Sequence, residues 1–572
     1  MRSAFIALLI VGFVLTSLVP AFYEIGRRNS LRPERDFELV HNFPTDFNFY
    51  LSRIRQGIEG RTSVIEQYTS EPHEGSFLQV FYLGLGWLGR WWRVPEYRPG
   101  DVYHMARIVL GLTLLTLIWQ FCKKAFPQRE MSSSGLTRGS SLLSKMDSSF
   151  RWNDTMSILA FLLAVTASTW PKLLFYNGGW RFGGYMPWWS VMDSLQRITF
   201  IPHLLAGQSL IIALLLMLTN EAAMRRGGSW VFTGLLGFSL GIIFPPGLLF
   251  IFVVLFFLTL LELATRRRNT NTAPAGNAFD ILLQRGVFVL LSAPALGYLQ
   301  LMTSFYPWKR LVQVDIIRPL PFDYLEYFKA VGPVLPLGLV GLVAALIRRE
   351  KLMILPVAWV IAWLFLLFAF KLVPQQSPLR FSEMIVHVPL AVLTTYGLFL
   401  FFKRAKVLLV TCLLSLIALG LGVMLSSWWW QRDFVDHKIR AAYPLVPTGS
   451  YVMYPLKDFR AAMFYIHDHT SSDAVIFSET TAGNYLPVVA GRTVFAGHDN
   501  TVGYEQKQEI LKRFFGGKMS SAEAKSLLES SHVAMIFFGP QEKEDGGIKD
   551  LTKSYPFLQS VYSNSFVTVY TL

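Results

Sequence analysis

The chain has 572 residues, of which 52% are hydrophobic and only 16% are charged. Soluble globular domains carry about a quarter charged residues, so this composition excludes an ordinary soluble domain and indicates a polytopic membrane protein in a lipid bilayer. The formal net charge is +15. Because the basic residues lie in short clusters between apolar segments, they are typical of residues that orient membrane spans, and no nucleic-acid partner is expected.

Eleven apolar segments are predicted to be transmembrane helices. They cover residues 4–22, 104–122, 155–175, 198–219, 230–244, 248–264, 279–302, 332–347, 352–370, 383–402 and 407–426. Basic clusters follow alternate segments, for example at 266–268, 348–351 and 403–406. By the positive-inside rule these clusters and the N-terminus are cytoplasmic, and the C-terminus lies outside. We expect the first segment to be an uncleaved anchor.

Two segments between the spans have unusual compositions. Residues 78–92 are apolar but contain Gly84, Gly86 and Gly89, and we predict a re-entrant or interfacial helix pair there. Residues 131–149 are rich in serine and low in complexity, which predicts a disordered insertion without a catalytic role.

The composition changes after Trp430. Residues 431–572 alternate between helical and strand patterns and end in a predicted β-hairpin at 558–562 and 566–570. The sequence therefore predicts two domains: a membrane domain at 1–430, which includes the first outer loop at 23–101, and an extracytoplasmic α/β domain at 431–572.

The stretch at residues 43–57 combines an acid with an amphipathic helical pattern. We predict a short surface helix where membrane meets water, with Asp46 at its start and an apolar stripe beside basic residues. The stripe consists of Phe47, Tyr50, Leu51 and Ile54, and the basic residues are Arg53 and Arg55. An acid at such a position either serves chemistry at headgroup depth or only caps the helix.

Further polar residues fall in the predicted outer loops or at span ends, where charges are costly and often functional. They are Glu71, His73, Asp193, Arg197, His203 and Arg380. Arginines that line a groove can hold a phosphate, and a carboxylate can deprotonate a hydroxyl. Three of these residues also have a structural alternative: Asp193 caps the fourth span, His203 packs in the core, and Arg380 anchors the tenth span.

The order of these features resembles that of the GT-C superfamily of membrane glycosyltransferases. The resemblance rests on one N-terminal span, a long first loop with an early acid, many further spans and a terminal α/β domain. The segment 44–50 resembles the first-loop D-x-x-x-Y motif, and 73–77 with the following glycines and Arg107 is similar to the H-P-P-L…G…R-L passage. Asp193 is similar to a second outer acid. The paired prolines after His73 are missing, and Gln431 follows Trp428–Trp430 where sequon-reading enzymes carry W-W-D, so transfer to an asparagine sequon is not implied.

The resemblance implies an inverting glycosyltransferase on the outer face of a bacterial plasma membrane. It implies that Asp46 is the general base or orients the acceptor, with Asp193 as a second catalytic acid. Arg380, Arg197 and Arg53 would bind the phosphate of a polyprenyl-phosphate-linked sugar, and Glu71, His73, Tyr50 and His203 would line the groove. The acceptor is an unidentified glycan, lipid or protein. No residue is assigned to a metal, and the need for a divalent cation stays open.

Two other functions remain open from the sequence. A transporter or flippase of a lipid-linked or anionic substrate predicts matching halves with broken helices near the midplane, and neither halves nor midplane acids are visible. A non-catalytic scaffold, whose outer domain binds a partner, predicts that Asp46 is dispensable.

Overall fold

The computed structural model describes residues 2–127, 140–176, 178–220, 224, 228–266, 276–373, 376–447 and 452–572. The chain forms two compact units. Unit 1 comprises Met1–Leu18, Arg107–Gly297 and Leu320–Trp430, and unit 2 comprises Val19–Ala106, Tyr298–Pro319 and Gln431–Leu572. The sequence had assigned the first outer loop to the membrane domain, whereas the structure groups it with the C-terminal region.

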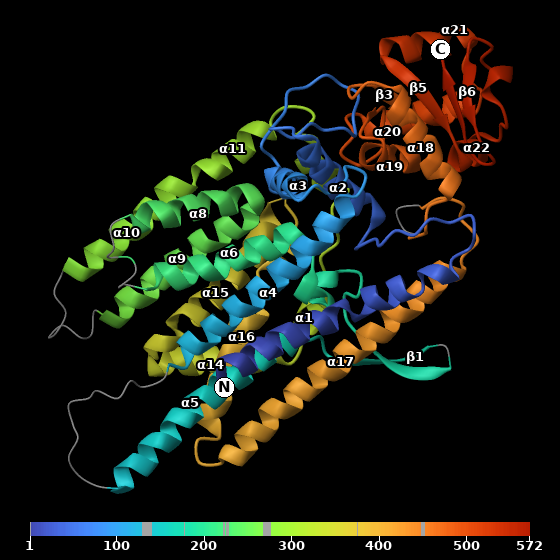
Figure 1. Ribbon diagram of the computed structural model, residues 1–572. Coiled ribbons are helices and arrows are strands. Elements are labelled where there is room, and N and C mark those ends of the chain that lie inside the picture. The colour runs from blue at the N-terminus through green and yellow to red at the C-terminus, as the bar shows by residue number, and fades with distance from the viewer. Residues whose placement is uncertain are drawn as a thin grey trace. The chain divides into compact units, whose positions relative to one another are not determined.

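Every predicted span contains a helix (Figure 1). The helices are α1 (Arg2–Gly26), α4 (Pro99–Ala125), α5 (Ser140–Thr166), α6 (Pro202–Leu218), α8 (Ser229–Ile243), α9 (Pro245–Arg266), α10 (Gly276–Ser292), α11 (Pro294–Met302), α13 (Tyr324–Val331), α14 (Val334–Arg348), α15 (Ile354–Ala369), α16 (His387–Phe401) and α17 (Lys406–Arg440). Among the described residues, six helices are long and apolar enough to cross a membrane, or seven if α13 and α14, bent by 82°, form one span. The chain is therefore a multi-pass membrane protein, and the number eleven stays a prediction.

The core of unit 1 is built on α15. Trp359 and Trp363 are fully buried on this helix. Their indole N–H groups donate to the Met384 carbonyl oxygen at 3.1 Å and to the Tyr327 hydroxyl at 3.2 Å. Burial of such large rings is stable because each polar N–H finds a partner inside the protein.

Two sequence expectations in unit 1 are wrong. The third span was predicted to reach residue 175, but α5 ends at Thr166, and β1 (Lys172–Tyr176) pairs antiparallel with β2 (Gly179–Gly183). The alternation of apolar and aromatic residues there suits a hairpin as well as a helix end. The segment 131–149 was expected to be disordered, but residues 140–149 belong to α5, and 131–139 lie outside the described residues. The eleventh predicted segment, 407–426, lies within helix α17, which continues to Arg440.

Unit 2 contains a five-stranded mixed sheet with the strand order β4-β3-β5-β7-β6. The strands are β3 (Val475–Phe477), β4 (Thr493–Val494), β5 (Val533–Phe538), β6 (Gln559–Ser563) and β7 (Thr568–Thr571). β3 runs parallel to β4 and β5, and β7 runs antiparallel to β5 and β6. The helices are α18 (Lys457–His469), α19 (Thr480–Val489), α20 (Tyr504–Phe515), α21 (Ser521–Ser530) and α22 (Pro540–Gly546). The predicted α/β character and the terminal hairpin are confirmed.

The first loop contributes two helices to unit 2, α2 (Pro44–Glu59) and α3 (Val80–Trp91). Phe49 of α2 and Tyr68 lie in one hydrophobic core with residues of the C-terminal sheet and helices, including Ile476, Leu486 and Phe537. This shared core explains why residues so distant in sequence form one compact unit.

Helix α3 was predicted to be a helix pair broken at glycines, but it is one continuous helix. Two of its three glycines, Gly86 and Gly89, lie at close contacts. A Cβ added to Gly86 would lie 2.7 Å from the Gly57 Cα atom of α2, and one added to Gly89 would lie 2.8 Å from a Val102 methyl group. Glycine at these positions permits close helix packing, which the sequence pattern does not separate from a helix break.

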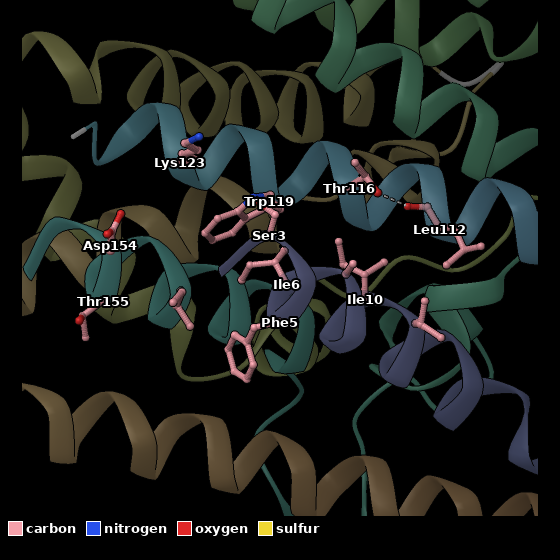
Figure 2. A pocket seen from close by; sticks show the side chains of 13 residues that line it. Ser3, Phe5, Ile6, Ile10, Leu112, Thr116, Trp119, Lys123, Asp154 and Thr155 are labelled. Atoms are coloured by element: carbon pink, nitrogen blue, oxygen red, sulfur yellow. Dashed lines mark hydrogen bonds between the residues drawn. The ribbon is translucent and has the colours of Figure 1, made fainter. Parts of the chain in front are cut away.

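Unit 1 also has an open groove with a volume of about 940 Å³. Figure 2 shows that α1, α4 and α5 line it, with Lys123 and Asp154 near one end and apolar side chains such as Ile6 and Ile10 inside. None of the nine candidate site residues lies in it, so the candidate chemistry is elsewhere.

Candidate functional site

Helix α2 is buried on most of its surface, which corrects the prediction of a surface helix. Its buried residues include the polar Asn48, Ser52 and Gln56. Asn48 donates to the Asn484 side-chain oxygen at 2.9 Å, and Gln56 donates to the Ile65 carbonyl oxygen and the Gln67 side chain, each at 3.0 Å. Because these groups have partners inside unit 2, a helix with an amphipathic pattern is stable in a buried position.

Asp46 is at the exposed end of this helix. It lies in the first turn of α2, and its side chain is 51% exposed. The N-cap residue is Phe43, and no side chain caps the helix. Asp46 Oδ1 lies 3.7 Å from His498 Nε2. Capping therefore does not account for Asp46, and its carboxylate is accessible beside an imidazole.

Arg53 is fully buried and has all its guanidinium nitrogens engaged. Its Nε donates to Gln79 at 3.0 Å, Nη1 to the Ser52 hydroxyl at 2.7 Å, and Nη2 to the Glu66 carboxylate at 2.6 Å. The guanidinium also lies over the Phe49 ring, 3.8 Å from its centroid. In this position Arg53 stabilises the first loop, and we do not retain it among the phosphate ligands.

Three further groove residues are held within unit 2. His73 Nε2 accepts from the Glu66 backbone N–H at 3.0 Å, and Nδ1 donates to the Glu71 carbonyl oxygen at 2.7 Å. The Glu71 carboxylate pairs with Lys507 at 2.7 Å. The Tyr50 ring stacks on Tyr82, with the centroids 4.6 Å apart.

The ion pair of Lys507 with Glu71 has an electrostatic consequence. Burial lowers the pKa of the Lys507 ammonium below its ordinary value, and the Glu71 carboxylate opposes part of that change. Lys507 also donates to the Phe495 carbonyl oxygen at 3.0 Å. Glu71 thus compensates a buried charge and links the first loop to α20 within unit 2.

In unit 1, Asp193 has four donors. Oδ1 accepts from the backbone N–H groups of Leu195 at 2.8 Å and Gln196 at 3.1 Å. Oδ2 accepts from the Gln196 side chain at 3.2 Å and from the Ser427 hydroxyl at 2.5 Å. These bonds hold the turn between the short helices η2 (Ser190–Met192) and η3 (Gln196–Thr199). They engage both carboxylate oxygens of Asp193 in structural hydrogen bonds.

The two terminal nitrogens of the Arg197 guanidinium differ: Nη2 is hydrogen-bonded and Nη1 is not. Nη2 donates to the carbonyl oxygens of Val165 at 2.9 Å and Ala167 at 2.5 Å. Within the described part of the chain, Nη1 is buried without a hydrogen-bond partner, as is Nε2 of His387. Unsatisfied buried polar atoms of this kind require an explanation, such as a water molecule or a ligand.

The two remaining candidates also belong to unit 1. Arg380 lies in the short helix η6 (Pro378–Glu383), and His203 lies in the first turn of α6. Both have partners inside the structure. The structure thus places Asp46 beside His498. Asp193 and Arg197 are near each other in the sequence, and each is held by its own hydrogen bonds within unit 1.

His498 is not among the site residues predicted from the sequence. The segment Gly497–Asn500 has the composition of a turn, and nothing in it indicates that its histidine lies beside Asp46. Among the described residues, no group of three or more His, Cys, Asp or Glu side chains is arranged to hold a metal ion.

Comparisons with known proteins give matches at the level of structure. No protein-family model matches the chain, and no curated protein matches its sequence. The chain is similar to a solved structure of ArnT from Cupriavidus metallidurans bound to undecaprenyl phosphate, with a TM-score of 0.52, 12% identity, and coverage of 98% of this chain and 97% of that one. It is also similar to AglB, an archaeal oligosaccharyltransferase from Archaeoglobus fulgidus, in complex with an inhibitory peptide and a dolichol-phosphate, with a TM-score of 0.45, 13% identity, and coverage of 95% and 72%.

The likeness to ArnT spans nearly the whole of both chains. It confirms the GT-C-like fold predicted from the sequence: a multi-pass helical membrane protein with a C-terminal α/β region. At 12% identity the likeness concerns the fold, and the activity has to be argued from the residues of this chain.

Proposed function

We propose that this protein is an inverting glycosyltransferase that moves a sugar from a polyprenyl phosphate to an acceptor hydroxyl, on the outer face of a bacterial plasma membrane. The observation that carries the proposal is the exposure of the Asp46 carboxylate and its position beside His498. Asp46 is half-exposed at the first turn of α2 beside His498, whereas Asp193 and Glu71 are engaged by the donors described above. Of these three candidates, Asp46 is the carboxylate best placed to accept a proton.

The proposed reaction is a single displacement. The acceptor oxygen forms a bond to the anomeric carbon while the bond from that carbon to the phosphate oxygen breaks. The hydroxyl proton passes to the Asp46 carboxylate, and polyprenyl phosphate leaves with the bonding electron pair. Attack opposite the leaving group inverts the anomeric configuration. A positioned base contributes about 10²–10⁴-fold to such a step.

The donor phosphate requires cationic partners, and we assign Arg197 and Arg380 to it. The unsatisfied Nη1 of Arg197 and Nε2 of His387 would find acceptors in phosphate oxygens. Charge-assisted hydrogen bonds of this type are about twice as strong as neutral ones, and they strengthen as charge develops on the leaving phosphate. The ArnT structure, whose fold this chain shares, holds undecaprenyl phosphate, which supports a lipid-linked donor.

The test is a transfer assay with the purified full chain. Undecaprenyl phosphate carrying radiolabelled sugars is mixed with cell-envelope material as the acceptor source. We expect label to move to the acceptor and undecaprenyl phosphate to be released in equal amount. Movement of intact donor across a vesicle membrane, without transfer to any acceptor, would instead identify a transporter and reject the proposal.

A further inference from the structure

We propose that His498 is a positioning residue for Asp46: its Nε2–H donates to one carboxylate oxygen and leaves the other oxygen for the acceptor hydroxyl. This inference rests on the proposed function. The two residues belong to segments far apart in the chain, α2 and the loop that follows β4, and both lie in unit 2.

The hydrogen bonds around the imidazole determine its tautomer. The backbone N–H of Asn500 donates to His498 Nδ1 at 3.1 Å. A ring nitrogen that accepts a hydrogen bond carries no proton, so in the neutral ring the proton is on Nε2. Nε2 is the atom that lies 3.7 Å from Asp46 Oδ1. The ring therefore presents a donor, not a lone pair, to the carboxylate.

The ring has little freedom to turn away. His498 is only 9% exposed. Its ring stacks on Phe49 of α2, with the centroids 4.6 Å apart and the planes inclined by 21°, and its centroid lies 5.4 Å from that of Tyr68. Because Phe49 and Asp46 are on the same helix, the stacking fixes the imidazole relative to the carboxylate.

The loop that carries His498 is held at several points. The Thr501 hydroxyl oxygen accepts from the backbone N–H of His498 at 3.4 Å and donates to the Tyr68 carbonyl oxygen at 2.6 Å. On Asp499, Arg310 Nε donates to the carbonyl oxygen at 2.7 Å, and Arg318 pairs with the carboxylate at 3.1 Å. These contacts supply the rigid support that a positioned catalytic group requires.

The separation of 3.7 Å is longer than a hydrogen bond, as is common for catalytic contacts before substrate binds. A shift of less than 1 Å brings Nε2 within bonding distance of Asp46. An exposed aspartate would otherwise rotate, and a donor on one oxygen holds the carboxylate in one orientation. His498 cannot itself take the acceptor proton, because Nδ1 is occupied by Asn500 and Nε2 is already protonated.

Two substitutions test the roles of the two ring nitrogens separately. In His498→Gln the side-chain amide N–H reaches the place of Nε2, so the donor to Asp46 is kept. In His498→Asn the side-chain oxygen replaces Nδ1 as acceptor for the Asn500 N–H, so the loop is supported but the donor is lost. Both variants lose the aromatic stacking on Phe49. They differ in which hydrogen bond of the ring they keep, so higher turnover of His498→Gln, in spite of its lost bond to Asn500, reports the donor to Asp46.

The measurement is turnover and thermal unfolding of the purified full-length variants, with undecaprenyl phosphate carrying the sugar that the wild type transfers. We expect His498→Gln to keep most of the turnover and His498→Asn to lose about 10–100-fold, by analogy with the loss on removing residues that orient metal ligands. The two unfolding temperatures should be similar. In His498→Asn the acidic limb of the pH–rate profile should move to higher pH, since the carboxylate has lost a donor.

Three other results have distinct meanings. Equal turnover of the two variants, whether normal or reduced, would overturn the positioning role. An unchanged pH–rate profile in His498→Asn would also overturn it. The absence of transfer by the wild type would reject the proposed function, and with it this inference.

Discussion

At the scale of single residues, two buried carboxyl groups at the carboxyl ends of neighbouring parallel strands have a property that can be measured. Glu479 follows β3 and Glu542 follows β5, and the Glu542 carboxylate accepts from the Glu479 backbone N–H at 2.9 Å. Burial, together with the nearby Glu542 charge, raises the pKa of Glu479 to about 8. Burial raises the pKa of Glu542 to about 7, against the effect of its backbone hydrogen bonds.

These shifts predict that unit 2 loses stability as pH rises. A carboxyl group whose pKa is raised in the folded state binds its proton more tightly there than in the unfolded chain. The stabilisation is therefore full below the ordinary pKa of 4.5 and is lost as pH rises through about 8, with a total on the order of a few kcal/mol. We expect a lower unfolding temperature at pH 8.5 than at pH 5.5.

The matched variant is Glu479→Gln, which keeps the shape of the side chain without a charge. Its unfolding temperature should exceed that of the wild type at pH 8.5 and should fall less between pH 5.5 and 8.5. An identical pH dependence in the two proteins would show that this pair does not titrate as described.

The sequence identifies candidate residues by their chemical type, but it does not reveal their hydrogen-bond partners. Arg53 binds Glu66 and Gln79, and Asp193 accepts from Ser427. These partners lie in other segments, and only the folded chain brings them near. The residue type predicts which group could bind a phosphate or take a proton, whereas the fold decides whether that group is still available. For this reason Asp46 stays in the proposal, Arg53 does not, and His498 enters it.

At the scale of elements, the crossing of α2 and α3 depends on two glycines. A Cβ added to Gly57 would clash with the Leu83 carbonyl oxygen and lie 2.8 Å from the Gly86 Cα atom. A Cβ added to Gly86 would clash with the Ile54 carbonyl oxygen. Gly84, on the same helix α3, has no atom within 4 Å of an added Cβ, so it provides a matched control.

We expect Gly57→Ala and Gly86→Ala each to destabilise the protein by about 1–3 kcal/mol, the usual cost of overpacking. Gly84→Ala should be neutral or stabilising by up to about 1 kcal/mol, because alanine favours a helix over glycine. Thermal unfolding in one detergent compares the three variants. Equal effects at all three positions would mean that the close crossing does not hold the helices.

Helix positions were predictable because apolar runs and helical periodicity are local properties of the sequence. The expected helices at 458–469 and 481–489 match α18 and α19 closely. The environment of a helix is not local. Helix α2 has the amphipathic pattern of a surface helix, yet Asn48 and Gln56 find partners in other segments of unit 2. In α3, Gly86 and Gly89 permit close packing and do not break the helix.

At the scale of the whole molecule, the predicted orientation in the membrane is open to a direct test. We expect the C-terminal region outside and the loop before α17 in the cytoplasm. In a background without Cys122 and Cys412, Lys525→Cys should react with a membrane-impermeant thiol reagent in intact cells. Lys525 has a 54% exposed side chain. Arg404→Cys should react only after the membrane is opened, and the reverse pattern would place Asp46 on the wrong side of the membrane.

The central claim is that the Asp46 carboxylate performs proton transfer, and Asp101 offers a matched comparison. Asp101 also lies in the first turn of a helix, α4, and its side chain is 54% exposed, similar to Asp46 at 51%. Removing either charge should cost about 0.3–1 kcal/mol of stability through the helix dipole. Only Asp46 has His498 beside it.

The decisive measurement is the turnover per folded molecule of purified Asp46→Asn and Asp101→Asn in the sugar-transfer assay. Because asparagine cannot take a proton from the acceptor, we predict a fall of about 10²–10⁴-fold for Asp46→Asn. Turnover of Asp101→Asn should equal that of the wild type. Equal turnover of the two variants would contradict the assignment of Asp46 as the catalytic base.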